Sequence, residues 1–461
     1  MLTTTINKQI EDYLKQEQLT INQFSERSGI NSGTLSHILN GKKTIAMQQL
    51  DKITFGMGLA EGHFYELYLQ ECLLNAAPDW RRLGPFLHRC ADLHKLTCIR
   101  QAAYFMLDKL TYAPVLFETA ESFLAAGKKE AAAILYECLA ESEKYQHSER
   151  LALCQYRIFT SKLCQDQDVN ALAAVQFEPY LDRLEEGYQL DAINELINVH
   201  TSLHRWDKVE FWANKLKHSA TIQYELCKRG TISSIETRKP LVFYILYSYL
   251  SLGDVYSEYG DYRKALQYIP FYAECGWVEH PSPEELRIIH QFQEWAVANS
   301  LMYRLMDGRV EVLPDYVHYI SSRESEIFVA LCSIIVAANK YKMNIDDILI
   351  RFEAHLKLQE QQWPFGIMNP LVTVNQHTRM LAELGVYFLE RKQIHKGILL
   401  ILDSLESSIK INSDRAALRC IGLFEEYRDY ATAEALHKYK FLIGEVRKLN
   451  EKKIGFSIGY S

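Results

Sequence analysis

From residue 61 onward the chain repeats one pattern, in which apolar residues recur every three or four positions between short turns. Such turns contain Gly127, Gly230, Gly260 and Pro281-Ser282-Pro283. Apolar residues at this spacing form one face of an α-helix, and the alternation typical of strands is nearly absent. A chain of 461 residues also exceeds what one hydrophobic core usually organises. The sequence therefore predicts an all-α fold, built as an extended array of helices.

One segment shows the repeating unit most clearly. It resembles a tetratricopeptide repeat, a helix-turn-helix unit of about 34 residues. The matching positions are Tyr249, Leu252-Gly253, Tyr256, Gly260-Asp261-Tyr262, Ala265 and Ile269. Weaker copies are Phe123 with Gly127 and Ala132, Leu196-Ile197 with His200 and Val209, Leu384-Gly385 with Phe388 and Gly397, and Phe424 with Asp429-Tyr430 and Ala433. We expect a tetratricopeptide-like right-handed helical solenoid of about eight or nine helix pairs.

The first 60 residues carry a different pattern. Apolar positions predict a first helix, and Thr20 offers a hydroxyl that can cap a second. Gly29 can adopt the positive φ of a tight turn before a third helix, which Asn31 or Ser32 would cap. That helix should end at Asn40-Gly41. The apolar positions are Ile6, Ile10 and Leu14 in the first helix, Ile21 and Phe24 in the second, Leu35, Ile38 and Leu39 in the third, and Met47, Leu50, Ile53 and Leu59 in a fourth.

The stretch Leu19 to Lys43 resembles the phage-repressor type of helix-turn-helix domain, although Leu39 stands where that family commonly has an acidic residue. In such domains the second helix of the motif lies in the major groove of double-stranded DNA. The resemblance implies that Ser32, Gly33 and His37 face base edges. Residues suited to phosphate contacts are Gln23, Thr34, Asn40, Lys42 and Lys43.

These patterns predict three parts: a helix-turn-helix DNA-binding domain over residues 1–60, connecting helices over 61–110, and a repeat domain for sensing and dimerisation over 111–461. Residues 1–60 carry a net charge of +1 and residues 61–461 one of −8. A charge of +1 is weak evidence for DNA binding, so the motif carries that prediction. No low-complexity linker separates the parts, and we expect folded helices to couple them.

Composition also predicts where the protein works and what it lacks. No basic and apolar leader and no run of about 18 apolar residues occurs, which indicates a cytoplasmic protein without a membrane segment. The ten cysteines form no C-x-x-C pair, and we expect reduced, mostly buried thiols without disulfides or metal. Because nucleotide-binding, hydrolase and metalloprotease motifs are missing, we expect neither enzymatic activity nor a cofactor.

A phage-repressor helix-turn-helix joined to degenerate tetratricopeptide repeats resembles the peptide-pheromone receptors of the Rap, Rgg, NprR, PlcR and PrgX (RRNPP) group, with arbitrium receptors as relatives. The resemblance implies a homodimeric transcription regulator. In that family a short signalling peptide binds the concave groove of the repeats and changes the hold on DNA, as in quorum sensing or phage lysis-lysogeny control.

The same comparison suggests where a peptide would bind. Residues three before and one after the small residue of an inner helix lie on one face. Around Ile197 this rule selects Asn194 and Asn198, whose amides can bind both backbone groups of an extended peptide. It extends the candidate site to Tyr247, Leu250, Asp254 and Arg379.

Two other functions stay open. The repeats can serve as a scaffold that sequesters a partner protein, or the chain can be a repressor with no peptide ligand. Net charge does not separate these alternatives.

Overall fold

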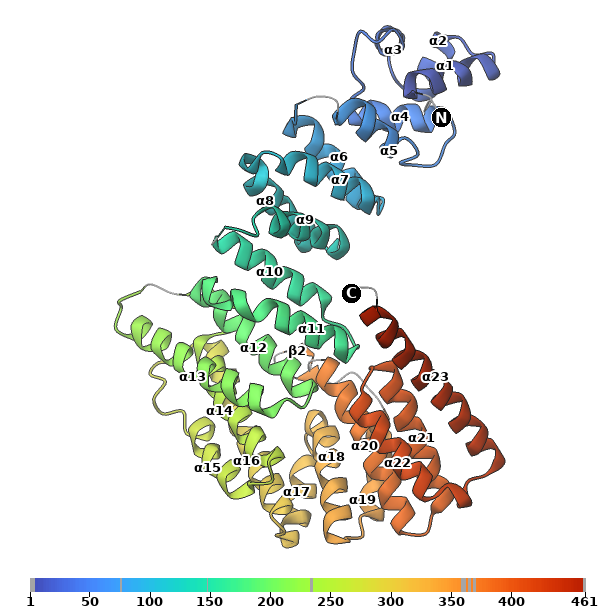
Figure 1. The fold of residues 1–461 in the computed structure, drawn as a ribbon. Helices are drawn as coiled ribbons and strands as arrows, with labels where there is room; N and C mark the ends of the chain where they lie inside the picture. The colour runs from blue at the N-terminus through green and yellow to red at the C-terminus, as the bar shows by residue number, and fades with distance from the viewer. Residues whose placement is uncertain are drawn as a thin grey trace. The chain divides into compact units, whose positions relative to one another are not determined.

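The computed structural model describes residues 5–74, 77–146, 148–232, 235–357, 362–363, 366–367 and 370–458. These residues are largely helical, and the strands among them are β1 (Gln362–Trp363) and β2 (Gly366–Ile367), which pair antiparallel. The predicted all-α fold is confirmed (Figure 1). The chain divides into two compact units, Met1–Ser161 and Lys162–Ser461. The division at residues 60 and 110 stays a prediction.

The first unit begins with the four expected helices, α1 (Ile6–Gln16), α2 (Ile21–Ser28), α3 (Ser32–Leu39) and α4 (Met47–Gly56). Thr20 caps α2, and Gly29 ends it with a φ of +67°. Asn31, rather than Ser32, caps α3 by accepting the Gly33 N–H at 2.9 Å. The expectation that Leu59 belongs to the fourth helix is wrong, because α4 ends at Gly56. Buried side chains that join the four helices are Ile10, Phe24, Leu35, Ile38, Leu50 and Ile53.

The helix-turn-helix packs directly on the elements that follow it in the first unit. The Tyr65 hydroxyl donates to Asp51 at 2.7 Å, and the Tyr68 hydroxyl donates to the Ile45 carbonyl at 2.8 Å. Arg89 Nε donates to the same Asp51 carboxylate at 3.0 Å. Folded elements therefore support the DNA-binding domain, as expected. The elements that follow α4 in the chain are α5 (Tyr65–Tyr68), the π-helix η1 (Leu69–Leu73), α6 (Trp80–Asp92), α7 (Leu96–Leu107), η2 (Leu110–Tyr112), α8 (Ala113–Ala125), α9 (Lys129–Ser142) and α10 (Glu149–Lys162).

The second unit continues the helical array. Its α-helices are α11 (Gln167–Phe177), α12 (Glu186–Ser202), α13 (Trp206–Lys228), α14 (Leu241–Glu258), α15 (Tyr262–Ala273), α16 (Pro283–Met306), α17 (Leu313–Ile320), α18 (Glu324–Tyr341), α19 (Asp346–Arg351), α20 (Pro370–Glu390), α21 (Ile394–Lys410), α22 (Asp414–Glu426) and α23 (Ala433–Ile458). Short 3-10 turns are η3 (Glu178–Arg183), η4 (Val310–Val312), η5 (Glu353–Leu356) and η6 (Arg428–Tyr430). Among the described residues, α6 to α23 are eighteen helices, which agrees with the expected eight or nine pairs.

The segment that resembles a tetratricopeptide repeat forms the helix pair α14 and α15. Gly260 turns the chain with a φ of +82°, and Asp261 caps α15 by accepting the Lys264 N–H at 3.0 Å. Gly253 lies where a Cβ would be 3.1 Å from the Tyr303 hydroxyl of α16. A larger residue here would require the Tyr303 side chain to shift where a third helix packs on the pair.

The weaker copy at Gly385 and Gly397 marks the close crossing of α20 and α21. A Cβ at Gly385 would lie 2.7 Å from Ile401 Cγ1, and one at Gly397 would lie 2.8 Å from the Gly385 carbonyl oxygen. Real Cβ atoms do not approach so closely, so the two backbones touch only because both residues are glycine.

Alternate helices of the second unit form a layer that closes on itself. Each of α12, α14, α16, α18 and α20 contacts the next, and α20 also contacts α12. Figure 1 shows α12 and α20 side by side although they are far apart in the sequence. We call these five helices the inner ring.

Candidate functional site

Helix α3 presents the residues predicted to read bases. Gly33 and His37 are exposed and lie one turn apart, and Ser32 beside them is half-buried. The Asn31 cap fixes where this helix begins, since its side chain accepts the Gly33 N–H. Burial of Leu35 and Ile38 on the opposite side holds α3 against the rest of the domain. The arrangement allows the start of α3 to enter a major groove, as the resemblance implies.

The predicted phosphate-binding residues lie around this helix. Gln23 uses its carbonyl oxygen to accept the Thr20 N–H at 2.9 Å, which leaves its amide nitrogen for an outside acceptor. Lys42 and Lys43 are exposed, and their backbone N–H groups donate to the His37 carbonyl at 2.9 and 3.1 Å. The loop that carries both lysines is therefore tied to the end of α3. Asn40 is exposed and Thr34 is half-buried.

The two asparagines predicted to bind a peptide lie on α12. Asn198 Oδ1 accepts the Tyr247 hydroxyl of α14 at 2.7 Å. Asn194 Oδ1, one turn earlier, is buried and has no hydrogen-bond partner in the described part of the chain. An unpaired buried acceptor costs about 1–3 kcal/mol. The structure thus contains an acceptor next to Asn198 that a ligand N–H would satisfy.

The residues of α14 that were predicted to bind a peptide already contact neighbouring side chains. Tyr247 stacks on Phe243 with ring centroids 5.5 Å apart, and Leu250 packs against the apolar cluster of α14 and α16. Asp254 accepts the Tyr303 hydroxyl at 3.0 Å. Burial raises the pKa of Asp254 to about 7, against the opposing effect of the hydrogen bond from Tyr303. This carboxyl therefore titrates near neutral pH.

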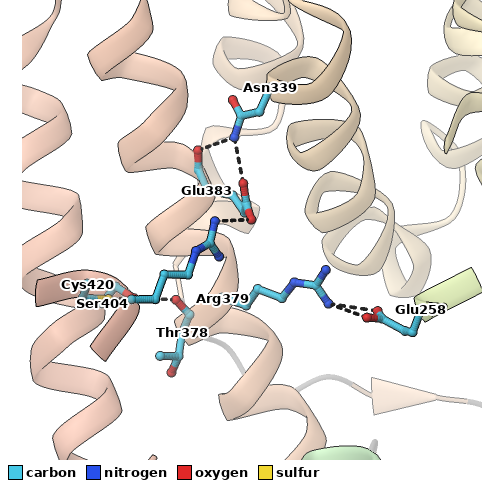
Figure 2. A network of polar contacts seen from close by, with 8 residues as sticks. Glu258, Asn339, Thr378, Arg379, Glu383, Ser404 and Cys420 are labelled. Carbon is cyan, nitrogen blue, oxygen red and sulfur yellow. Dashed lines mark hydrogen bonds and ion pairs between the residues drawn. The ribbon is translucent and has the colours of Figure 1, made fainter. Parts of the chain in front are cut away.

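Arg379 of α20 joins two helices that are not neighbours in the ring. Its Nη1 donates to both Glu258 oxygens, at 2.9 and 3.2 Å, although the residues are 121 positions apart. Figure 2 shows this pair reaching from α20 to α14. Beside it, Asn339 of α18 donates to the Glu383 carboxylate at 2.9 Å. Polar contacts thus link α20 both to its neighbour α18 and to α14 across the inner ring.

Sequence reasoning did not find several of these partners. Glu258 lies one turn after Asp254 on α14, so the helical offset that selected Asp254 also points to it. Tyr303 and Glu383 come from other helices, and no local pattern relates them to α12 or α14. His200, expected as part of a weaker repeat copy, is fully buried, and its Nε2 lies 3.0 Å from Glu178 Oε1.

The structure also shows how far the cysteines are buried and whether its helices could span a membrane. Six of the ten cysteines are buried, in line with the expectation of mostly buried thiols, three are half-buried and Cys164 is exposed. Within the described residues, no helix is both long and apolar enough to cross a bilayer.

Comparison with known proteins places one part of the chain in a family. Residues 9–55 match the Cro/C1-type HTH DNA-binding domain. No curated protein matches the chain. Among solved structures, a "Circular tandem repeat protein with novel repeat topology and enhanced subunit contact surfaces" is similar at 10% identity, over 96% of this chain and 90% of that one. The TM-score is 0.15, so the two chains do not superpose as wholes.

The family match covers α2, α3 and most of α1 and α4, the helices whose caps and core were described above. The chain carries a Cro/C1-type HTH DNA-binding domain at its N-terminus, followed by an all-helical repeat-like body.

Proposed function

We propose that this protein is a cytoplasmic, homodimeric transcription regulator whose repeat domain binds a short signalling peptide and changes its hold on DNA. The DNA-binding part rests on the Cro/C1-type domain of residues 9–55. The peptide-binding part rests on one observation above the others. Asn194 Oδ1 is buried without a hydrogen-bond partner in the described structure, one turn from Asn198 on the inner ring.

The chemistry of the site favours an extended main chain as the ligand. A peptide N–H would satisfy Asn194 Oδ1. Asn198, one turn further along α12, accepts the Tyr247 hydroxyl and also hydrogen-bonds Glu195, so a peptide carbonyl would compete with Glu195 for its amide nitrogen. Paired amides recognise backbone groups that every peptide shares, so side-chain selectivity must come from neighbours. Asp254 and Arg379 supply charges of both signs nearby on the ring.

The test begins with heptapeptides that the wild-type protein enriches from a random library. Asn194→Leu should bind these peptides at least about tenfold more weakly, because one hydrogen bond in a desolvated site is lost. The same change should leave stability equal or higher, because it removes an unpaired buried amide. Both effects together distinguish a binding residue from a structural one.

Asn214→Leu is the matched control. Asn214 lies on α13 outside the inner ring and is exposed, and its side chain donates to the Glu210 carbonyl. It should bind the enriched peptides as the wild type does. If the wild type enriches no peptide, the proposal fails in favour of a scaffold for a partner protein or a repressor without a peptide ligand.

A further inference from the structure

The inner ring closes where α12 meets α20, and Asn375 lies at this joint. Its Nδ2 donates to the Ser202 carbonyl at 2.8 Å, and its Oδ1 is 2.8 Å from His204 Nε2. Because that oxygen can only accept, the imidazole donates from Nε2. Asn375 is buried, as are its polar neighbours Thr373 and Thr378 on the same half of α20. Asn375 therefore buries a polar side chain at the joint, whereas the Thr378 hydroxyl lies 2.6 Å from that of Ser407 on α21.

A second set of contacts closes the same joint from the outside. The Gln167 N–H, in the first turn of α11, donates to the Ile411 carbonyl at the end of α21 at 2.9 Å. A backbone N–H in the first turn of a helix, which has no partner within its own helix, thus donates to a backbone carbonyl at the end of another helix. Asn412 adds its Nδ2, which lies 3.2 Å from both Asp166 oxygens. These residues are more than 240 positions apart in the sequence.

The joints among α16, α18 and α20 are of a different kind. Between α16, α18 and α20 a cluster of fully or nearly fully buried apolar side chains fills the interface, including Leu305, Phe328, Leu331 and Leu384. Separating those helices would expose apolar surface to water. Water can replace the hydrogen bonds of Asn375 and Asn412, so breaking these contacts costs less than separating α16, α18 and α20.

The residues proposed to bind peptide are engaged while the ring is closed. Asn198 holds Tyr247, Asp254 accepts from Tyr303, and Arg379 holds Glu258. Of these, Arg379 lies one turn after Asn375 on α20, so movement of α20 away from α12 would also strain its pairing across the ring. Opening of the joint between α12 and α20 would thus also loosen the contact that Arg379 makes with Glu258 on the inner face of the ring.

We propose that the contacts of Asn375 and Asn412 form a polar clasp, a reversible joint at which the inner ring opens to admit its ligand. The inference rests on the proposed function, since it describes how access to the same site is regulated. A ligand that binds only the open form shifts the population toward it, and its apparent affinity is reduced by the small open fraction. Weakening the clasp should therefore increase both opening and ligand capture.

Opening is measured first, without any ligand, by hydrogen–deuterium exchange on the full chain. The reporter is the Gln167 amide, whose hydrogen bond crosses the clasp. Asn375→Ala combined with Asn412→Gly removes both side chains, and glycine tolerates the φ of +55° at residue 412. Exchange at Gln167 should become at least about tenfold faster while the helical content is unchanged.

Asn339→Ala is the control, because it removes a polar contact between α18 and α20 away from the clasp. It should leave exchange at Gln167 as in the wild type. Unchanged exchange in the double variant, or equal acceleration in the control, would overturn the clasp.

Ligand capture is measured with the heptapeptides enriched by the wild type. The double variant should bind them with an association rate at least about fivefold higher, in proportion to the larger open fraction. An unchanged association rate despite faster exchange would overturn the gating role. If no peptide is enriched while exchange responds as expected, the proposed peptide-sensing function fails and the clasp stands as a reversible joint.

Discussion

Replacing Asp254 with asparagine should remove the pH dependence that this residue gives to the free energy of unfolding. Burial raises the pKa of Asp254 from the ordinary 3.8 to about 7 in the folded protein. Between these values the folded state keeps a proton that the unfolded chain has released. Stability therefore falls as pH rises from about 4 to about 7, and the loss is complete above that range.

The size of the effect follows from the pKa. A change from 3.8 to about 7 corresponds to about 4 kcal/mol, because one pKa unit is worth about 1.4 kcal/mol. Asp254 is half-buried, so water reaching the carboxyl screens part of this cost. We expect a fall in the free energy of unfolding of about 2 kcal/mol between pH 4.5 and pH 8.

Asparagine resembles the protonated carboxyl and still accepts the Tyr303 hydroxyl through its oxygen. Denaturant unfolding, followed by circular dichroism, should show Asp254→Asn equal to the wild type near pH 4.5 and about 2 kcal/mol more stable at pH 8. Asp429→Asn, which alters an exposed carboxyl, is the control and should not gain stability at pH 8. If the wild type and Asp254→Asn lose stability in parallel as pH rises, the assignment of the effect to Asp254 is wrong.

Four further predictions concern DNA and packing. Ser32→Ala or His37→Ala should cost about 1–3 kcal/mol of binding to the selected operator and leave binding to random DNA unchanged, as measured by fluorescence anisotropy. Lys42→Ala combined with Lys43→Ala should weaken binding to the operator and to random DNA alike, and should lower the slope of log K against log salt by about 2. An unchanged slope would show that these lysines do not contact phosphate. A homodimer with two such domains should protect an inverted repeat in footprinting, whereas one undivided asymmetric site would argue against it. Gly385→Ala should destabilise the chain by about 1–3 kcal/mol, because its Cβ would lie 2.7 Å from Ile401 Cγ1, while Gly422→Ala, with open space around it, should not.

The DNA-binding domain was predictable because its signals are local. The Thr20 cap, the positive φ of Gly29 and the apolar positions of α3 each depend on residues within one or two turns. The misplaced Leu59 is a local error as well, since α4 ends at Gly56. The sequence left Asn31 and Ser32 open as the cap of α3, and one hydrogen bond selects Asn31. The base-reading and phosphate-binding roles are implied by the resemblance and stay predictions.

For the repeat body, the sequence predicted only the fold class and individual pairs of adjacent helices. Periodicity and small residues located α14 with α15 and the crossing of α20 with α21, because these pairs are adjacent in the chain. The helical offset selected Asn194 and Asn198 as neighbours on one face. It did not reveal that Asn198 is paired to Tyr247 while Asn194 Oδ1 has no partner, since that depends on how α14 packs beside α12.

Tertiary structure alone decided that the array closes on itself. Asn375 meets Ser202 across 173 positions and Arg379 meets Glu258 across 121. A hydrogen bond between distant residues leaves no periodic trace in the sequence, because each partner occupies an ordinary polar position on its own helix. Only the accumulated rotation of successive helix pairs brings α20 against α12. The sequence by itself thus determined the local elements and the DNA-binding domain, and packing over the whole second unit determined the ring, the clasp and the unpaired amide inside the proposed site.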